Sequence, residues 1–507
     1  MRLTDLLAGL DGCHVEGSLQ CEIPLVTDDS RQVIPGSLFV ALKGTRADGR
    51  AYVREALARG AAAVVLENQK EQGSMPVLPG SVTRILVPNS HRALGHVADA
   101  FWHHPSRRVK LIGITGTNGK TTTAFLVESI LKTYGKRTGM IGTVRWGFDS
   151  NWQPAPQTTP GAVEIQSRLD EMAKGGVEFC VMEVSSHALA QDRVWGCRFE
   201  VAIFTNLSQD HLDFHHTMES YFDAKALLFT EYPIGGAVIN RDDPWGGKLL
   251  GMCRAPRLSY SAEEAGDLVV RDPRLSMEGL SGVLCTPCGE HPVSARLLGK
   301  HNRMNILAAA GACHFLGLDL PTIARGIADL DGVPGRFEKV DEGQDFGVMV
   351  DYAHTDDALR NLLTTARELN PRRLVVLFGC GGDRDKGKRP LMGDVAARLA
   401  DFVVLTSDNP RSEDPEVILG EIEVGVERAP VRVPYLRIPD RREAIARAIS
   451  EASAGDLVVI AGKGHETEQI VGSRRYPFDD RQVAREFLRR RLGTGAGLKR
   501  QGKQGDD

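Results

Sequence analysis

The stretch Gly113-Ile-Thr-Gly-Thr-Asn-Gly-Lys-Thr-Thr-Thr123 decides the fold of this chain, because it sets a glycine-rich loop between a predicted strand and a predicted helix. The strand is the mainly apolar run from Val109 to Ile114. The helix is predicted from residues that recur on one side and from a glycine placed where it would end: Thr122, Phe125, Leu126, Ile130 and Gly135. This order is typical of a phosphate-binding loop in an α/β domain.

The loop carries the groups that bind a phosphate. Its glycines let successive backbone N–H groups converge on one point, and the helix N-terminus adds the positive end of its dipole. Lys120 can reach the outer phosphates of a nucleotide, and Thr121 can place its hydroxyl on Mg²⁺. The spacing is a compact variant, because Ile114 stands where the common pattern has glycine and Gly116 supplies the glycine instead. The alternative, a glycine-rich turn with a solvated lysine, is disfavoured by the agreement of strand, loop and helix.

Composition indicates an ordinary globular chain. The 507 residues are 42% hydrophobic and 25% charged, which allows about three domains. With 62 basic and 66 acidic residues the net charge is −4, so neither nucleic acid nor an anionic membrane is indicated as a partner. No apolar run approaches the ~20 residues of a membrane span, and Asp5 and Asp11 interrupt a signal-peptide core. We expect a cytoplasmic monomer with no membrane insertion.

The cysteines fit the same compartment. Nine cysteines, an odd number in a long chain, are typical of reduced thiols in a cytoplasm. Cys285 and Cys288 form a lone C-x-x-C pair with no second pair at zinc spacing. Ordinary thiols are therefore favoured over a metal or redox site.

Residues 1–109 are predicted to form a small α/β unit. Apolar patterning predicts strands at Ser37–Leu42 and Ala63–Leu66 and a helix at Tyr52–Ala63. Two polar turns, Thr27–Arg31 and Gly44–Arg50, contain the turn formers Asp, Ser and Gly, and each is favoured as a plain turn when taken alone.

Residues 110–335 are predicted to form a second α/β domain around the phosphate loop. Its other elements are strands at Val177–Val184, Val201–Phe204 and Ala237–Ile239, a hairpin-like or loop region at Gly147–Trp152, and a helix start at Gln157–Pro160. Glu183 and His211 lie at or just past the ends of two of these strands. Ligands of open parallel sheets bind beyond the carboxyl ends of the strands, so both side chains are expected near the phosphates.

Residues 336–492 are predicted to form a third, doubly wound domain, which begins after the Pro/Gly-rich stretch Gly332–Phe337. Amphipathic helices such as Asp357–Leu369 and Arg441–Ala452 alternate with strands. Four apolar strands each lead into a polar motif, namely Asp351–Thr355, Gly379–Arg389, Thr406–Arg411 and Gly462–Glu466. Four such motifs at one sheet edge predict a wide polar cleft. Residues 493–507, rich in Gly, Lys and Gln, are predicted to be a disordered tail.

Single side chains allow more than one interpretation. Lys225 lies on a predicted helix and, taken alone, is best explained as a solvated lysine, while His211 is either a metal ligand or an orienting histidine. The planar fork of Arg411 suits a carboxylate, and the neighbouring Asp408 and Asn409 can take an ammonium group. Pro410 stiffens this loop, so the four residues can hold an amino acid by both of its charged groups.

Together these motifs resemble the Mur ligase family over nearly the whole chain. A single tetrapeptide is a weak signal, whereas the ordered set is specific: Gly116–Thr122, Glu183–His187, Asn206–His211, His301–Asn305, Gly335–Glu338, Asp351–His354, Asp408–Arg411 and Gly462–Glu466. The resemblance implies an α/β fold of three domains, with a central phosphate-loop, parallel-sheet ATPase domain and a C-terminal doubly wound (Rossmann-like) domain. The first domain would bind the UDP-muramoyl substrate.

The resemblance also implies binding residues for three small-molecule substrates. UDP-N-acetylmuramoyl-dipeptide would contact Ser30, Thr45, Arg46, Ala47, Thr158, Thr159, Ser185, Gln191 and Arg193. ATP would contact Gly116, Thr117, Asn118, Gly119, Lys120, Thr121, Thr122, Asn305, Arg336 and Asp351. Diaminopimelate would contact Arg389, Asp408, Asn409, Pro410, Arg411, Gly462 and Glu466. Gln157 departs from the family, whose members often carry Asn before the two threonines, so no substrate contact is assigned to it.

Catalysis, by the same resemblance, would use Lys120, Glu183, His211 and Lys225, with Mg²⁺ as cofactor and ATP as cosubstrate. Mg²⁺ would be held by Thr121, Glu183, His211 and Lys225, the last modified by CO₂ to N6-carboxylysine, which turns a cation into a carboxylate-like oxygen donor. The D-glutamate γ-carboxylate would attack the γ-phosphate of ATP to give an acyl phosphate, which the amine of meso-2,6-diaminopimelate then captures. Lysine-adding relatives lack the arginine of the Asp-Asn-Pro-Arg motif, and lysine would leave Arg411 without a partner.

Three other functions share part of this pattern. A phosphate-loop kinase would end at a phosphorylated product, and it has no need of a second, amino-acid-holding cleft. Folylpolyglutamate synthase, a sister ligase, shares the phosphate loop. The Asp408–Arg411 motif and the N-terminal domain favour a Mur ligase that acts in cell-wall synthesis. A non-catalytic nucleotide-binding module would bind ATP without turnover, and it gives no reason for Glu183, His211 and Lys225 together.

Overall fold

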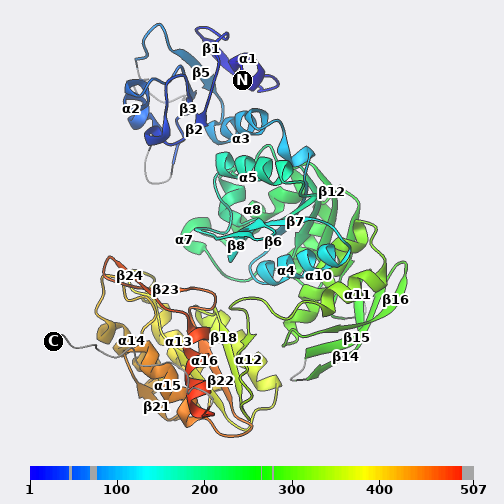
Figure 1. Cartoon of the computed structure of the whole chain (residues 1–507), viewed down its shortest axis with the longest axis vertical. Coiled ribbons are helices and arrows are strands. Elements are labelled where there is room, and N and C mark those ends of the chain that lie inside the picture. Colours follow the sequence, from blue (N-terminus) through cyan, green and yellow to red (C-terminus); the bar gives the residue numbers. More distant parts are fainter. Residues whose placement is uncertain (45–47, 69–76, 264, 277–278, 494–507) are drawn as a thin grey trace, which may run out of the picture. The chain divides into compact units, whose positions relative to one another are not determined.

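The computed structural model describes residues 1–44, 48–68, 77–263, 265–276 and 279–493 (Figure 1). The chain divides into two compact units. The first contains Met1–Pro273, Gly282–Ser294 and Arg303–Asp329, and the second contains Arg274–Ser281, Ala295–Asn302 and the chain from Leu330 onward. The tail predicted to be disordered lies outside the described residues from position 494.

The first unit opens with a five-stranded sheet in the order β1-β5-β4-β3-β2. Its strands are β1 (His14–Glu16), β2 (Val26–Thr27), β3 (Leu38–Val40), β4 (Ala63–Glu67) and β5 (Thr83–Val87). All neighbours are parallel except β1 and β5. Alternate strand residues pack on α1 (Leu3–Leu6) and α3 (Ser90–Phe101) on one face and on α2 (Val53–Ala58) on the other. The strands predicted at Ser37–Leu42 and Ala63–Leu66 are observed as β3 and β4, while the boundary of a separate unit at residue 109 stays a prediction.

The helix predicted at Tyr52–Ala63 is shorter than expected. The 3₁₀-helix η2 (Gly49–Tyr52) precedes α2, which ends at Ala58. Gly60 has a φ of 91°, a left-handed backbone conformation that stops a helix, and the chain then enters β4.

The central sheet has eight strands in the order β13-β12-β11-β6-β10-β7-β8-β9. They are β6 (Lys110–Thr115), β7 (Thr138–Ile141), β8 (Arg145–Phe148), β9 (Asn151–Pro154), β10 (Phe179–Glu183), β11 (Phe199–Phe204), β12 (Ile234–Asn240) and β13 (Arg257–Tyr260). The sheet is parallel from β13 to β7, and β8 and β9 add an antiparallel hairpin at its edge. β6 therefore lies between β10 and β11, the strands that lead to Glu183 and to the His211 loop.

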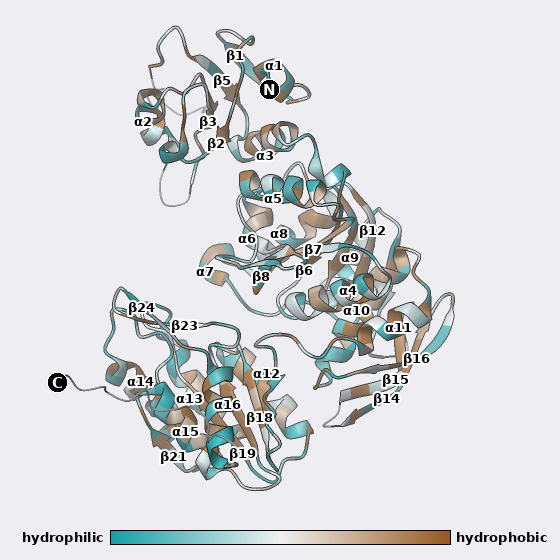
Figure 2. Cartoon of the chain, in the orientation of Figure 1, coloured by the Kyte–Doolittle hydropathy of each residue, from teal (hydrophilic) through white to brown (hydrophobic). Residues whose placement is uncertain are grey.

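Helices cover both faces of the parallel part. On one face lie α5 (Ala162–Lys174), α8 (Met218–Thr230) and α9 (Pro244–Met252). On the other lie α4 (Lys120–Thr133) and α10 (His301–Phe315), whose Phe315 ring fills the space where a Cβ on Gly236 of β12 would stand. Every residue of β6 except Lys110 is buried, as expected for a parallel strand covered on both faces. Figure 2 shows the apolar colour of the parallel strands of this sheet. α11 (Leu320–Ala328) packs against α4. β14 (Val269–Ser276), β15 (Gly279–Thr286) and β16 (Gly289–Ala295) form a separate three-stranded sheet.

The second unit is built on a six-stranded sheet in the order β17-β18-β22-β19-β20-β21. Its strands are β17 (Glu338–Lys339), β18 (Gly347–Asp351), β19 (Leu374–Phe378), β20 (Phe402–Leu405), β21 (Tyr435–Arg437) and β22 (Leu457–Ala461), all parallel except β17. The four strands predicted to end in polar motifs are consecutive neighbours. Their motifs therefore emerge from one sheet edge.

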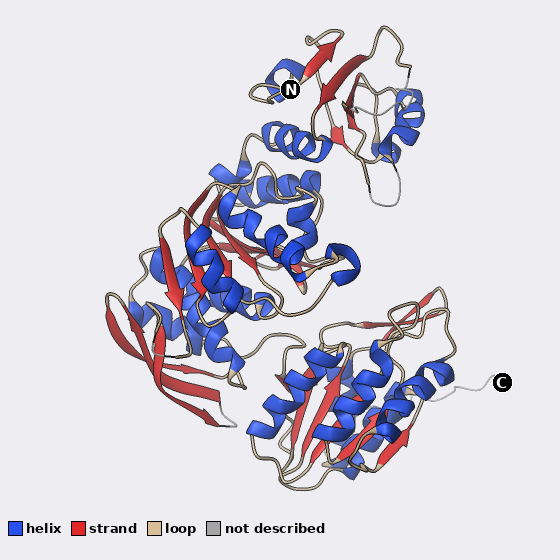
Figure 3. Cartoon of the chain, turned by 180° about the vertical axis from the view of Figure 1, so that it is seen from behind, coloured by secondary structure: helices blue, strands red, loops and turns tan. Residues whose placement is uncertain are grey.

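The sheet is doubly wound, with helices packed on both faces. Alternate residues of each strand face opposite sides of the sheet. One set of residues packs on α12 (Asp356–Glu368), α13 (Lys388–Leu399) and α14 (Pro415–Arg428). The other set packs on α15 (Arg441–Glu451) and α16 (Asp480–Arg491). Figure 3 shows the sheet between these layers. A hairpin of β23 (Glu468–Val471) and β24 (Arg474–Pro477) follows β22. Of the helices that the structure describes, none is both long and apolar enough for a membrane span.

Candidate functional site

The phosphate loop joins β6 to α4 and needs glycine at two positions. Gly116 has a φ of 143°, and a Cβ placed there would lie 1.9 Å from Oγ1 of Thr205. Gly119 has a φ of 84°, and its Cβ would lie 2.3 Å from Oδ1 of Asn305 on α10. The loop thus lies between the end of β11 and α10, and Asn305, predicted to contact ATP, lies beside it.

The segment after β11 holds the loop in shape. The backbone N–H of Thr117 donates to the carbonyl of Asn206 at 2.8 Å, and the N–H of Asn118 donates to Oδ1 of Asn206 at 3.0 Å. The hydroxyl of Thr205 donates to the carbonyl of Asn118 at 2.6 Å. Asn206 belongs to a quoted motif, but neither it nor Thr205 had been predicted to shape the loop.

Two lysines share one backbone oxygen in this loop. Lys120 donates to the carbonyls of Gly116 at 2.9 Å and Thr117 at 2.8 Å, and Lys225 of α8 donates to Gly116 at 2.8 Å. The interpretation of Lys225 as a solvated residue is wrong, because it is 1% exposed. Burial lowers the pKa of Lys225 well below its usual range, and nearby Lys120 adds to that shift.

Oxygen donors converge at the end of β10. Glu183 is fully buried, and its carboxylate accepts from the hydroxyls of Thr121 and Thr143, each at 2.9 Å, and from the N–H of Thr143 at 2.9 Å. Mg²⁺ prefers such oxygen ligands, so Thr121 and Glu183 suit this ion. Thr143 had not been predicted from the sequence.

His211 lies in a cluster of rings around Tyr221. The His211 ring is 4.8 Å from His187 and 6.1 Å from Tyr221, and Nζ of Lys225 lies 4.6 Å from the Tyr221 ring centre. Burial lowers the pKa of His211, which favours the neutral imidazole that a metal needs. Among the described residues, no group of three His, Cys, Asp or Glu side chains is placed to hold a metal. Glu183 and His211 would therefore need further donors, such as Thr121 and a modified Lys225.

The residues predicted to bind the muramoyl-dipeptide come together next to Glu183. Oγ1 of Thr159 donates to the carbonyl of Glu183 at 2.8 Å and accepts from the N–H of Ser185 at 3.0 Å. Arg193 donates to the Gln191 side chain at 2.7 Å and to the carbonyl of Thr159 at 3.0 Å. Thr158 bonds the hydroxyl of Thr143 at 3.1 Å, and Gln157 accepts from Arg193 at 3.2 Å. Gln157 thus supports Arg193 here.

The N-terminal sheet carries the residues predicted for the nucleotide of this substrate. Ser30 is buried in the 3₁₀-helix η1 (Ser30–Gln32), and its hydroxyl donates to Glu55 at 2.7 Å. Thr45, Arg46 and Ala47 lie outside the described residues.

In the second unit, the Asp-Asn-Pro-Arg loop after β20 is clipped by the hairpin β23–β24. The N–H of Arg411 donates to the carbonyl of Ile470 at 3.1 Å, and the N–H of Gly472 donates to the carbonyl of Arg411 at 2.7 Å. The guanidinium of Arg411 donates to the carbonyl of Gly382 at 2.8 Å. Asp408 faces Gly462, where a Cβ would lie 2.7 Å from Oδ2 of Asp408.

The predicted ATP contacts of this unit lie together at the end of β18. The Asp351 carboxylate accepts from the N–H groups of Phe337 at 2.7 Å and Ala353 at 2.8 Å. Burial raises the pKa of Asp351, opposed by the charge of Arg336. The Arg336 guanidinium lies 5.2 Å from the Tyr352 ring centre.

Arg389, predicted to bind diaminopimelate, is instead committed to carboxylates of the chain. Its side chain on α13 is fully buried and donates to Glu413 at 2.9 and 3.0 Å and to Glu421 at 2.6 Å. This arrangement argues against a contact between Arg389 and diaminopimelate, because the guanidinium is buried and already pairs with two carboxylates. Arg384, which had not been predicted, is exposed and lies beside Arg411: both side chains flank Gly381, within 3.7 and 3.0 Å of a Cβ placed there.

The Arg389–Glu413 pair predicts an acid-sensitive contribution to stability. Hydrogen bonds from Arg389 lower the pKa of Glu413 to about 2. The stabilisation is therefore fully present above the ordinary glutamate pKa near 4.5 and is lost as the pH falls towards 2. We expect the free energy of unfolding to fall more steeply between about pH 5 and 2 in the wild type than in Glu413→Gln. Denaturant titrations at several pH values test this, and parallel slopes would contradict it.

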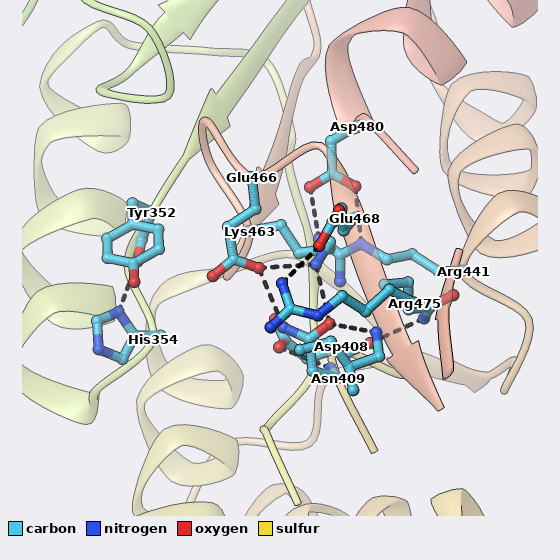
Figure 4. A network of polar contacts seen from close by, with 12 residues as sticks. Tyr352, His354, Asp408, Asn409, Arg441, Lys463, Glu466, Glu468, Arg475 and Asp480 are labelled. Atoms are coloured by element: carbon cyan, nitrogen blue, oxygen red, sulfur yellow. Dashed lines mark hydrogen bonds and ion pairs between the residues drawn. The ribbon is translucent and has the colours of Figure 1, made fainter. Parts of the chain in front are cut away.

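Beneath the motifs of β20 and β22 lies a fully buried ion pair. Arg441 donates to both carboxylate oxygens of Asp480, at 2.8 and 2.7 Å (Figure 4). It also donates to the carbonyls of Ser407 at 3.2 Å and Ala461 at 3.0 Å, the residues directly before Asp408 and Gly462. Arg441 therefore ties two neighbouring motif loops to one point.

Replacing Arg441 by methionine is expected to lower the free energy of unfolding by about 3–5 kcal/mol, because the Asp480 carboxylate would stay buried without a partner. Arg442→Met is the matched control. Its ion pair with Glu486 is exposed, so about 0–1 kcal/mol should be lost. Denaturant unfolding of the full chain measures both values, and equal losses would contradict the prediction.

All nine cysteines are free thiols. Cys285 is half-buried and Cys288 exposed. The preference for ordinary thiols stays a prediction.

Comparison with known proteins places this site in a family. The Mur ligase middle domain matches residues 114–313, the Mur ligase glutamate ligase domain matches residues 335–464, and the domain described as Mur ligase family, catalytic domain, matches residues 22–102. UDP-N-acetylmuramoyl-L-alanyl-D-glutamate–2,6-diaminopimelate ligase of Geobacillus kaustophilus is 48% identical over 97% of this chain and 100% of its own length.

Solved structures agree with this placement. A UDP-N-acetylmuramoyl-L-alanyl-D-glutamate–2,6-diaminopimelate ligase is similar with a TM-score of 0.71 and 34% identity, over 97% of this chain and 99% of that one. Folylpolyglutamate synthase of Mycobacterium tuberculosis shares the fold with a TM-score of 0.60 and 20% identity, over 78% of this chain and 94% of that one. The chain, with its three α/β domains and its phosphate loop, belongs to the Mur ligase family.

Proposed function

We propose that this protein is an ATP-dependent ligase that adds meso-2,6-diaminopimelate to UDP-N-acetylmuramoyl-L-alanyl-D-glutamate through an acyl phosphate, in the synthesis of peptidoglycan precursors. The observation that carries the proposal is the convergence of Lys120, Thr121 and Glu183 beside the phosphate loop. Full-length relatives that carry this activity in their names support the substrate assignment.

In this proposal Thr121, Glu183, His211 and Lys225 hold Mg²⁺. The Thr121 hydroxyl and the Glu183 carboxylate already lie 2.9 Å apart, which suits a hard cation. When bound, Mg²⁺ supplies positive charge that stabilises the transferring phosphoryl group.

The residues of the chain then have distinct tasks. The glycine loop surrounds the phosphates with Thr117, Asn118 and Thr122, and the N-terminus of α4 presents its free N–H groups to them. Lys120 leaves its loop carbonyls to contact the γ-phosphate. Thr158, Thr159, Ser185, Gln191 and Arg193 orient the peptide so that its γ-carboxylate can attack. Asn305, Arg336 and Asp351 contact the nucleotide. The amine of diaminopimelate then attacks the acyl carbon, and phosphate leaves as the amide forms.

Modification of Lys225 to N6-carboxylysine is part of the proposal. Two lysine amines donate to the carbonyl of Gly116, and one of them is fully buried. Reaction of the Lys225 amine with CO₂ forms an N–C bond and releases a proton, so an anion replaces a buried group next to Lys120. The product adds oxygen donors to the set of Thr121 and Glu183.

The amino-acid site in this proposal lies at the loop after β20. Arg411 takes the distal carboxylate of diaminopimelate, and Asp408, Asn409, Gly462 and Glu466 surround its amino group, with Pro410 fixing the loop. Arg384 replaces Arg389 as the second guanidinium, because it is exposed next to Arg411 while Arg389 is buried in ion pairs.

The remaining assignments are proposed on the same basis. The substrate-binding domain spans residues 1–109, the ATP-binding domain 110–335 and the amino-acid-binding domain 336–492, each with its own sheet. The protein acts as a cytoplasmic monomer on small-molecule substrates. Ser30, with Thr45–Ala47, contacts the nucleotide of the muramoyl substrate.

The deciding experiment measures ADP release from ATP and UDP-N-acetylmuramoyl-L-alanyl-D-glutamate with a panel of amino acids. We expect release that depends on meso-diaminopimelate and is at least about 10⁴-fold less efficient with lysine. A kinase would release ADP without any amine, and a nucleotide-binding module would release none. A folylpolyglutamate synthase would need a folate and glutamate.

A further inference from the structure

Lys463 is buried between two side chains proposed to surround the amino group of the diamino acid. It lies directly after β22 in Gly462–Glu466 and is fully buried. Its Nζ donates to Oδ1 of Asn409 at 3.2 Å and to Oε2 of Glu466 at 2.8 Å (Figure 4). Burying a lysine costs desolvation free energy even when it has two acceptors, so the position of Lys463 requires an explanation.

The lysine fixes which way the Asn409 amide faces. Oδ1 of Asn409 accepts from Lys463 and also from the N–H of Ile470 at 2.9 Å. Nδ2 of Asn409 therefore points the other way and donates to Oε2 of Glu466 at 3.0 Å. A reversed amide would set its NH₂ group against two donors, so only one orientation is compatible with these contacts.

The result is a carboxylate with two unlike oxygens. Lys463 and Asn409 both donate to Oε2 of Glu466, whereas no described residue donates to Oε1. The Glu466 side chain is 33% exposed, so Oε1 can receive a ligand. The position of this oxygen is set by the lysine that holds the other one.

The buried Arg441 keeps the two loops in register. Because it binds the carbonyls of Ser407 and Ala461, it fixes the backbone that precedes Asn409 on one loop and Lys463 on the other. The 2.8–3.2 Å contacts among Lys463, Asn409 and Glu466 can then form without further adjustment of either strand.

We propose that Lys463 is a positioning residue for amino-acid selection: it holds Asn409 and Oε2 of Glu466, so that Oε1 accepts the ammonium group at the non-reacting end of diaminopimelate. This inference rests on the proposed function. It assigns that ammonium group to Glu466 and the neighbouring carboxylate to Arg411. Lys463 itself does not touch the substrate.

The test compares diaminopimelate with 2-aminopimelate, which keeps the reacting amine and the distal carboxylate but lacks the second ammonium group. KM values for both, and for ATP, are measured in the wild type and in Lys463→Met. We expect the variant to raise KM for diaminopimelate about 10- to 100-fold, by analogy with the loss of an outer partner that orients a metal ligand. KM for 2-aminopimelate and for ATP should change little. Lys339→Met, which removes an exposed ion pair of the same unit, is the matched control and should leave every value unchanged.

Purely structural damage gives a different result. A variant that raises both KM values by the same factor, and so keeps the preference for diaminopimelate, overturns the inference. Glu466→Gln provides a second route if Lys463→Met does not fold by circular dichroism. That substitution should lose the same preference, whereas an unchanged preference in it would also overturn the inference. Where Lys463→Met folds, combining the two changes should cause little further loss, since both act on one contact.

The measurements distinguish failure of the proposed function from failure of the positioning role of Lys463. If the wild type releases no ADP with diaminopimelate, the proposed function fails and this inference falls with it. If the wild type is active and selective but Lys463→Met keeps its preference, only the positioning role of Lys463 is refuted.

Discussion

Replacing Lys225 by alanine is expected to lower amide formation by about 10²- to 10³-fold, the loss typical of removing one group that stabilises developing charge. Lys225 is buried beside Lys120 and Tyr221, where a carbamate would add oxygen donors to Thr121 and Glu183. Alanine leaves a space of about the same position and shape as the lost side chain. Small carboxylates such as acetate are therefore expected to restore part of the activity.

The measurement is ADP release with all three substrates across a range of acetate concentrations. Lys174→Ala is the matched control, since Lys174 is 74% exposed and far less constrained. A second readout is independent of turnover: protein equilibrated with ¹³C-bicarbonate should show a carbamate carbon signal that Lys225→Ala lacks. Absence of that signal in the wild type, or no rescue at any carboxylate concentration, would refute the modification.

Replacing Arg411 by alanine is expected to raise KM for diaminopimelate by about 10²- to 10³-fold and to leave KM for ATP nearly unchanged. The guanidinium is the group proposed to receive the distal carboxylate, and an unpaired charged partner in a binding site costs several kcal/mol. Discrimination against lysine should fall at the same time, because a site built around a polar partner rejects ligands that lack it. Arg411→Lys should recover little, since an ammonium group cannot form a bidentate pair.

Michaelis constants for diaminopimelate, lysine and ATP in each variant provide the test. Arg475→Ala is a control from the adjacent hairpin, because Arg475 is 69% exposed and, among the described residues, pairs with Glu468 on the neighbouring strand. Equal losses for diaminopimelate and ATP would show that Arg411 supports the fold and does not select the amino acid.

Much of the fold could be predicted because strands buried on both faces leave continuous apolar runs. β6 and β10 were expected within about two residues of their observed bounds, and β18, β19, β20 and β22 each end directly before one of the four predicted polar motifs or at its first residue. Short or half-exposed elements left weaker signals. β14 to β16 and the hairpin β23–β24 were missed. Most residues of β14, β16 and β24 are exposed, so these strands lack the continuous apolar run of a buried strand.

The candidate site divides in the same way. Residues with distinctive local chemistry, such as Lys120, Glu183 and Arg411, lie at or after the ends of predicted strands, so their position at a sheet edge could be predicted from the sequence. Lys225 could not be placed by chemistry alone, because a helical pattern does not reveal that one lysine points to the carbonyl of Gly116, 109 positions earlier. Arg389 and Arg384 show the converse limit. They lie five positions apart in one motif, and only the carboxylates of Glu413 and Glu421, supplied by later residues, distinguish the buried arginine from the exposed one.

The clip between Arg411 and the hairpin β23–β24 has a consequence for protein engineering. Backbone hydrogen bonds join Arg411 to Ile470 and Gly472, so the motif and the hairpin form one surface from two distant segments. Transplanting the four-residue motif alone from a relative with another amino-acid preference would leave the recipient hairpin mismatched. A chimera that exchanges both segments together should transfer the donor's preference, whereas single-segment grafts should yield weak, unselective catalysts.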